Sequence, residues 1–206
     1  MTRQIYAFAG RRGSGKSTAS QVLVDDGFVD VKFADPLKNM MRAFYKTCGV
    51  KRKTVERKLE GDLKEVPCEW LMGKTPRHAM QMLGTEWRDL IDTDMWSNIF
   101  TKRVLSGEVG DKIVCSDFRF AHEASVLEFL DAHTYRVVRP ELETTDDAAQ
   151  HVSETSTDTV PVNSGTIANC GTLGDLQSYV RSIVATNQVV AEMTDAEVAD
   201  LFSRTT

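Results

Sequence analysis

The sequence predicts an α/β fold in which a parallel β-sheet forms the middle of three layers and helices cover both of its faces. Along most of the 206 residues, short apolar runs alternate with segments whose apolar residues recur at helical spacing. This alternation is typical of a parallel sheet, because each strand needs a crossover helix before the next strand can run in the same direction. A second observation is the glycine-rich stretch 10–17, which stands between the first apolar run and the first helical segment. That order is typical of folds that bind phosphate groups at the start of a helix.

In the first half of the chain, proline and glycine mark the limits of the helices. Asp35-Pro36 supplies a helix cap and a proline suited to the first helical position. We expect Gly84 to stop the helix that begins after Thr75. The stretch 50–69 mixes basic and acidic residues, and we interpret it as an exposed insertion. The strands expected here are 5–9 and 29–33, and the helices are 16–26, 36–48, 76–83 and 92–105.

In the second half, one acidic connection interrupts the alternation of strands and helices. Residues 140–164 contain neither lysine nor arginine after the opening proline, and a polar connection of this length is usually functional or mobile. After residue 186, Thr194-x-x-Glu197 has the spacing of a helix capping box, so the tail 186–206 has room for one helix. The strands expected here are 112–116, 134–138 and 166–169, and the helices are 121–132 and 172–185.

Composition excludes several classes of protein. The length fits one domain with an insertion, and 41% hydrophobic residues suffice for a core. With 25 basic and 30 acidic side chains, the net charge of -5 weighs against tight binding to nucleic acid or to an anionic membrane. No apolar run approaches the length needed to span a bilayer, and the four cysteines are widely spaced. We therefore expect a cytoplasmic protein with reduced thiols.

The strongest motif is Gly10-Arg11-Arg12-Gly13-Ser14-Gly15-Lys16-Ser17, which matches the phosphate-loop pattern G-x-x-x-x-G-K-[ST] at every fixed position. Glycines let the backbone wrap around a phosphate, and the helix that starts at Lys16 directs its positive end toward it. Lys16 is expected to reach the β- and γ-phosphates of a nucleotide, and the Ser17 hydroxyl to ligate Mg²⁺. The motif therefore predicts nucleotide binding, without saying which reaction follows.

A second candidate position lies at the end of the strand 112–116. The carboxyl ends of parallel strands meet at one edge of the sheet, so Asp117 is expected near the phosphate loop, where it would hold Mg²⁺ directly or through water. Arg119 would project into the same crevice. The alternative is an aspartate that caps the next helix, followed by a surface arginine. No Asn-Lys-x-Asp motif for guanine is present, which weighs against a switch GTPase.

Several blocks of the sequence, in this order, resemble the deoxynucleoside monophosphate kinases of tailed bacteriophages. No block after the phosphate loop is specific alone, but the ordered set covers about residues 5–184. The blocks are Gly10–Thr18, Phe33-Ala34-Asp35-Pro36-Leu37-Lys38, Arg77-His78-Ala79-Met80-Gln81-Met82-Leu83-Gly84-Thr85-Glu86, Asp94-Met95-Trp96, Asp117-Phe118-Arg119-Phe120-Ala121-His122-Glu123, Val137-Val138-Arg139-Pro140, His151-x-x-Glu154 and Asn169-Cys170-Gly171-Thr172-Leu173.

The resemblance implies a P-loop, adenylate-kinase-like enzyme that moves the γ-phosphate of ATP to a deoxynucleoside 5′-monophosphate, with Mg²⁺, in nucleotide supply for DNA synthesis. Lys16, Asp117, Arg119 and Arg139 would act at the transferring phosphoryl group. The ATP side would comprise Arg12, Gly13, Ser14, Gly15, Lys16, Ser17, Thr18, Asn169, Gly171 and Thr172. The monophosphate side would comprise Asp35, Lys38, Arg77, Gln81, Gly84, Trp96, Arg119 and Glu123.

The resemblance also implies how the chain is divided. A kinase domain would cover 1–185, with a helical monophosphate-binding region at about 34–110 and a lid at about 140–165. The expected lid contains no arginine, although the lids of adenylate-kinase-like enzymes often supply some. A phage protein would work in the host cytoplasm, and a homodimer stays open.

Each assignment has an alternative. Lys38 fits a solvated helix position, Trp96 fits a core position, and Thr172 fits a helix cap. Two other functions also stay open. One is a P-loop kinase with an alcohol acceptor, such as dephospho-coenzyme A or a hydroxymethylated base, for which Asp35 would serve as base. The other is an ATP-binding regulator without catalysis.

Overall fold

The structure, a computed structural model, describes residues 3–140 and 159–193. Its centre is a five-stranded sheet in the order β2-β3-β1-β4-β5, in which every neighbouring pair is parallel. The prediction of a parallel sheet is therefore confirmed. The strands are β1 (Gln4–Ala9), β2 (Val29–Asp30), β3 (Lys112–Cys115), β4 (His133–Val138) and β5 (Gly165–Ala168).

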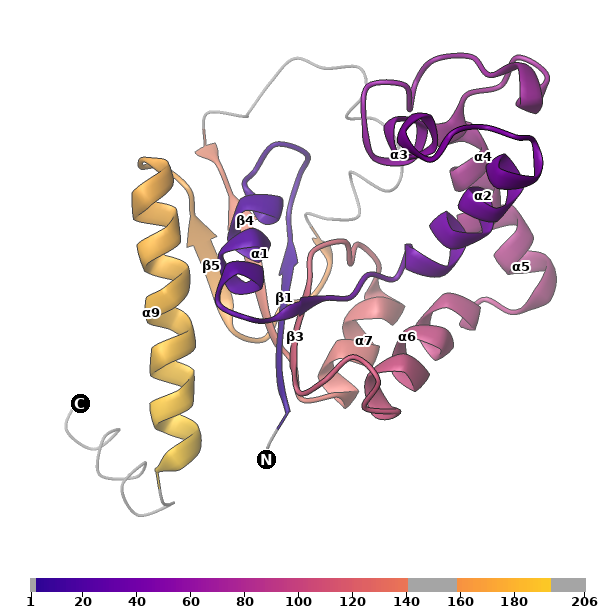
Figure 1. The fold of residues 1–206 in the computed structure, drawn as a ribbon. Helices are drawn as coiled ribbons and strands as arrows, with labels where there is room; N and C mark the ends of the chain where they lie inside the picture. Colours follow the sequence, from indigo (N-terminus) through magenta and orange to yellow (C-terminus); the bar gives the residue numbers. More distant parts are fainter. Residues whose placement is uncertain (1–2, 141–158, 194–206) are drawn as a thin grey trace.

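Helices cover both faces of this sheet (Figure 1). α1 (Lys16–Asp25) and α9 (Leu173–Glu192) pack on one face, where the side chains of Tyr6 and Phe8 point. On the opposite face, Ile5 and Ala7 share a buried cluster with residues of α6 (Met95–Leu105) and α7 (Ala121–Phe129). Residues 5–9 of β1 alternate between the two layers and are all buried, which is why this run is apolar.

A separate helical region projects beyond one end of this three-layer core (Figure 1). It has its own buried cluster, to which Leu37, Tyr45, Leu59 and Trp96 contribute. A second core of this kind lets the region keep its own shape while it remains joined to the sheet. Its elements are α2 (Asp35–Thr47), α3 (Arg52–Glu60), η1 (Glu69–Leu71), α4 (Pro76–Met82), η2 (Leu83–Trp87) and α5 (Arg88–Ile91).

The stretch 50–69 is not the exposed insertion that its charges suggested. It contains α3, and Val55 and Leu59 of this helix are buried in the same cluster as Tyr45 of α2. These two apolar residues stand four apart, which puts them on one helix face. Because the surrounding residues are mostly lysines, arginines and glutamates, the sequence pattern did not reveal these two apolar positions.

Gly84 does not stop its helix. The chain continues from α4 through the π-helical turn η2 into α5, which ends at Ile91. Gly84 is absent from the glycines with positive φ, so it does not adopt the left-handed conformation that ends helices. A π turn holds one residue more than an α turn and often occurs at functional sites.

Other boundaries also differ from the expected ones. α2 begins at Asp35 with Ala34 as its cap residue, so Pro36 is the second helical residue, and β2 is only two residues long. α9 continues past residue 185 to Glu192. The capping pattern at Thr194 and most of the expected lid lie outside the described residues. Within the described parts of the chain, no helix is both long and apolar enough to cross a membrane.

Candidate functional site

The phosphate loop joins the end of β1 to the start of α1, and its glycines adopt conformations that other residues rarely take. Gly10, Gly13 and Gly15 have φ values of 140°, 80° and 109°. A Cβ atom at Gly15 would lie 2.6 Å from the side-chain nitrogen of Asn169, so a methyl group there has no room. The sequence pattern thus reflects two needs at once, a left-handed backbone and a close approach.

Inside the loop, polar groups are arranged as an anion would require. The Lys16 Nζ atom donates to the carbonyl oxygens of Gly10 and Arg11, at 2.6 Å for Arg11, and so spans the loop. The Ser14 hydroxyl is buried and has no hydrogen-bond partner among the described residues. A buried hydroxyl without a partner is costly, and a phosphate oxygen would relieve that cost. The loop therefore fits a nucleotide phosphate.

The segment expected at the adenine also touches the loop. The Asn169 side chain donates to the Ser14 carbonyl oxygen at 2.9 Å and thereby ties the end of β5 to the phosphate loop. The Thr172 hydroxyl accepts from the Asp175 backbone N–H and caps α9. A helix cap was the alternative role expected for Thr172 from the sequence. Contact of Asn169, Gly171 and Thr172 with adenine stays a prediction.

Asp117 follows β3, and its carboxylate is engaged with the backbone that precedes α2. Its two oxygens accept from the N–H groups of Phe33 at 3.1 Å and Ala34 at 3.0 Å. Burial raises the pKa of Asp117, while the Ala34 N–H and the charge of Lys38 oppose that rise. The alternative role for Asp117, a cap of the next helix, is therefore wrong. Asp117 joins the sheet edge to the helical region.

The oxygens described near the loop suit a cation that is held largely by its substrate. Ser17 is exposed in the first turn of α1, and Asp117 still has a lone pair beyond the hydrogen bonds that it accepts from Phe33, Ala34 and Cys115. The described residues contain no group of three or more His, Cys, Asp or Glu that could hold a metal ion. Mg²⁺ commonly binds in this way, through one or two protein oxygens together with phosphates and water.

Glu123 shapes the loop that carries Arg119. One oxygen of its carboxyl group accepts from the backbone N–H groups of Arg119 at 2.6 Å and Phe120 at 3.1 Å. Burial, reinforced by the negative charge of Asp117, raises the pKa of Glu123 to about 8. Its visible contacts orient the 117–120 segment, and direct contact with substrate stays a prediction.

Three cations from three other segments influence Lys64 of the helical region. Burial lowers the pKa of Lys64, and the positive charges of Arg77, Lys38 and Arg119 lower it further, while Glu60 acts in the opposite direction. Such an influence requires each of these charges to lie near Lys64. We call Lys38, Lys64, Arg77 and Arg119 the cation cluster.

Lys64 is the member that sequence reasoning missed. It lies in the charge-rich stretch 50–69, where neither periodicity nor a motif distinguishes it from its neighbours. Its backbone oxygen accepts from the Arg77 N–H at 3.0 Å, so the segment that carries it is fixed to the start of α4. Only the fold brings it to the three cations already expected at the monophosphate.

The remaining predicted substrate residues lie around this region. Trp96 is buried in the helical core, its Nε1 atom has no partner among the described residues, and its ring lies 5.7 Å from that of Trp87. A Cβ atom at Gly84 would be 3.6 Å from Leu37, an ordinary contact. Asp35 accepts from the Lys32 N–H and from Arg103 at 3.1 Å. Gln81 lies on α4 one turn after Arg77, and Arg139 follows β4.

A family model described as deoxynucleotide monophosphate kinase matches residues 60–180 of the chain. A curated protein of Acanthamoeba polyphaga mimivirus, described as "Putative deoxynucleotide monophosphate kinase", is 33% identical over 180 residues, which cover 79% of this chain and 90% of that protein.

The solved structures with similar folds are more distant. TT1252 from Thermus thermophilus is 17% identical, with a TM-score of 0.48, and the match covers 90% of this chain and 98% of that one. An unliganded sugar kinase from Janibacter is 16% identical, with a TM-score of 0.39, over 88% of this chain and 94% of that one.

Proposed function

The chain belongs to the deoxynucleotide monophosphate kinase family, and from this premise we propose that it uses ATP and Mg²⁺ to phosphorylate a deoxynucleoside 5′-monophosphate at the cation cluster. The products are ADP and the deoxynucleoside diphosphate, a precursor for DNA synthesis. The order of the sequence blocks further supports an origin in a tailed bacteriophage, and hence work in the cytoplasm of its host. Whether the protein forms a homodimer is left to measurement.

The cation cluster is the observation that carries this proposal. Like charges repel, so side chains gathered in this way are stabilised by negative charge beside them. Arginine presents a planar fork of donors that suits phosphate oxygens, and Lys64 adds a half-buried ammonium group. A monophosphate dianion supplies both the charge and the acceptors.

The topology of the sheet supports a meeting of the two proposed phosphate sites at one edge. β1 and β3 are parallel neighbours with Ala7 opposite Cys115, and the two strands end on the same side. The phosphate loop follows β1, and the segment with Asp117 and Arg119 follows β3. Ligands of open parallel sheets bind at this carboxyl edge. Donor and acceptor phosphates would therefore approach each other there.

In the proposed reaction, an oxygen of the monophosphate attacks the γ-phosphorus of ATP. A new P–O bond forms while the bond from the γ-phosphorus to the β-γ bridging oxygen breaks, and ADP leaves. The attacking oxygen is already ionised at neutral pH, so no general base is needed. Catalysis then consists of positioning and charge neutralisation, for which we propose Lys16, Arg119 and Arg139.

Other residues would hold the substrates. On the donor side, residues 12–18 surround the phosphates, while Asn169, Gly171 and Thr172 face the adenine. Bound Mg²⁺ would neutralise phosphate charge, with Ser17 and Asp117 as protein ligands, directly or through water. On the acceptor side we propose Asp35, Lys38, Arg77, Gln81, Gly84, Trp96, Arg119 and Glu123, together with Lys64.

The test is ADP release with ATP and Mg²⁺ against a panel of deoxy- and ribonucleoside monophosphates, with the products identified by mass. The panel includes dGMP, dTMP, dCMP, dAMP and 5-hydroxymethylated pyrimidine nucleotides. A diphosphate product from a deoxynucleotide supports the proposal and names the accepted bases. Transfer only to an alcohol acceptor, or ATP binding without any transfer, would refute it.

A further inference from the structure

Two glutamates lie at either end of the short segment 60–65, and each is paired with a different member of the cation cluster. The Glu60 carboxylate lies 2.7 Å from the Lys38 Nζ atom. The Glu65 carboxylate accepts from the Nε atom of Arg77. Both cations are ones proposed above for the substrate phosphate, and both acids come from the stretch that sequence reasoning left without a role.

The exposure of these side chains differs in a way that matters for exchange. The side chain of Lys38 is 11% exposed, whereas those of Glu60 and Glu65 are 45% and 58% exposed. A carboxylate that is half in water can leave its partner at little cost, because water solvates the released charge. The lysine is enclosed and keeps its position, so it stays available for another anion.

The Lys64 ammonium group, between the two acids in sequence, completes the arrangement. Burial and three neighbouring cations lower the pKa of Lys64, and the negative charge of Glu60 opposes this shift. Glu60 and Glu65 each place a single negative charge beside one member of the cluster. A phosphate monoester dianion carries two charges on one compact group and has more acceptor atoms than a carboxylate.

We infer that Glu60 and Glu65 act as exchangeable counter-ions, which occupy Lys38 and Arg77 in the absence of substrate and are displaced by the phosphate of the incoming deoxynucleotide. This inference rests on the proposed function. The two glutamates are positioning residues, because they act on substrate through the cations they hold. Since one dianion replaces two carboxylates, the exchange favours phosphate monoesters over singly charged anions. The segment 60–65 thereby contributes to substrate selection.

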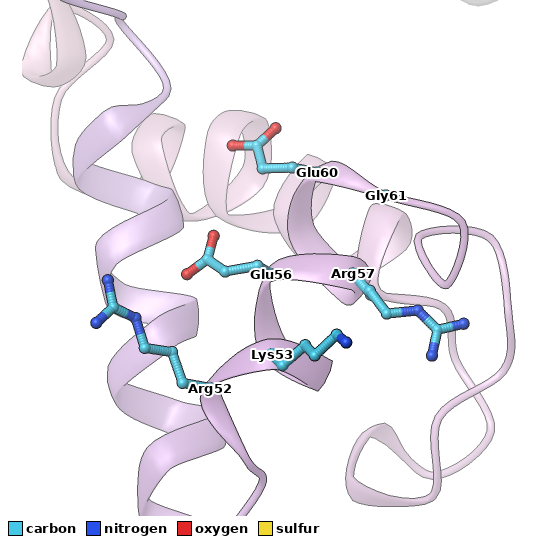
Figure 2. A pocket seen from close by; sticks show the side chains of 6 residues that line it. All are labelled: Arg52, Lys53, Glu56, Arg57, Glu60 and Gly61. Atoms are coloured by element: carbon cyan, nitrogen blue, oxygen red, sulfur yellow. The ribbon is translucent and has the colours of Figure 1, made fainter.

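The variants that test this are Glu60→Gln, Glu65→Gln and the double variant, with Glu56→Gln as the matched control. Glu56 lies one helical turn before Glu60, and its carboxylate pairs with Arg42 at 2.9 Å, while the charge of Lys38 acts on it more weakly. Figure 2 shows Glu56 and Glu60 on the same side of α3, while Lys53 and Arg57 point to the other side. An amide keeps the size of the side chain and removes its charge.

Without the competing carboxylate, the KM for the deoxynucleotide should fall. An exposed ion pair contributes little, so each single variant should lower this KM roughly two- to fivefold, and the double variant further. The KM for ATP should stay unchanged, and Glu56→Gln should match the wild type. A deoxynucleotide KM that stays equal or rises in a double variant of normal melting temperature overturns the inference.

A second readout does not depend on turnover. Inorganic phosphate, added alone, should raise the melting temperature of the double variant more than that of the wild type or of Glu56→Gln. Equal shifts in all three proteins would contradict exchange at these glutamates. Failure of the proposed function looks different, since the wild type itself would then transfer phosphate to no deoxynucleotide.

Discussion

The two phosphate sites that we propose for this protein, the donor site and the acceptor site, are built in opposite ways. The donor site is one continuous stretch, 10–17, whose shape depends on glycine backbone geometry and whose lysine is held by main-chain carbonyl groups. The acceptor site draws its cations from four segments, and acidic side chains balance two of them. One site is set by local geometry and the other by the packing of distant segments. The two should therefore respond differently to substitution.

The largest effect is expected from Lys16→Met, which removes the charge at the donor site. The kcat should fall roughly a thousandfold or more, because this lysine neutralises charge that develops during transfer. The melting temperature should stay close to that of the wild type. Lys102→Met, at an exposed position on α6, should leave kcat unchanged. A near-normal rate in Lys16→Met would show that Lys16 does not act in phosphoryl transfer.

Gly15→Ala tests whether the donor site depends on backbone geometry. Gly15 has a φ of 109°, where other residues are strained, and the new methyl group would meet Asn169, so either the Asn169 side chain or the loop must shift. The KM for ATP should rise roughly ten- to a hundredfold, as expected for one to three kcal/mol of strain. Gly27→Ala is the control, since its φ of 90° is also left-handed but nothing lies within 4 Å of the added atom. If both variants bind ATP alike, close approach does not matter.

Lys64→Gln tests the acceptor site at the residue that only the fold revealed. The KM for the deoxynucleotide should rise roughly tenfold, the usual cost of losing one charge-assisted hydrogen bond, while the KM for ATP stays constant. Lys53→Gln, at an exposed position on α3, should change neither constant. Equal effects on both substrates would mean that the two sites are not separate.

The smallest effect concerns pH. The pKa of Glu123 is raised from 4.5 to about 8, so between these values the folded protein binds more protons than the unfolded chain. Stability from this group is complete below pH 4.5 and is lost as the pH rises through 8. Glu123→Gln resembles the protonated form and can still accept both hydrogen bonds through one oxygen.

Melting temperatures between pH 5 and pH 8.5 check this. The variant should lose less stability over the range than the wild type, whereas Glu128→Gln, exposed on the same helix, should follow the wild type. Identical profiles for all three would show that the Glu123 carboxyl group is not protonated in the folded protein near neutral pH.

The same contrast explains what the sequence could reveal. The phosphate loop and the strands beside it were predictable because their signals lie within a few consecutive residues. Val55 and Leu59 are the only buried residues of α3, so its apolar periodicity was too short to predict a packed helix among so many charged residues. The prediction that Gly84 ends a helix was wrong because a glycine usually does so in a left-handed conformation, and tertiary packing decides whether it adopts one. Lys64 carried no local signal at all.

The three tryptophans have a practical consequence. Trp70 and Trp87 belong to the helical region, Trp96 of α6 is buried in the core of that region, and the strands contain no tryptophan. Intrinsic fluorescence excited at the indole band therefore reports mainly on the proposed acceptor side. Because the rings of Trp87 and Trp96 lie 5.7 Å apart, their transitions should couple and give a near-ultraviolet circular dichroism signal. The acceptor region thus carries its own optical probe, without any added label.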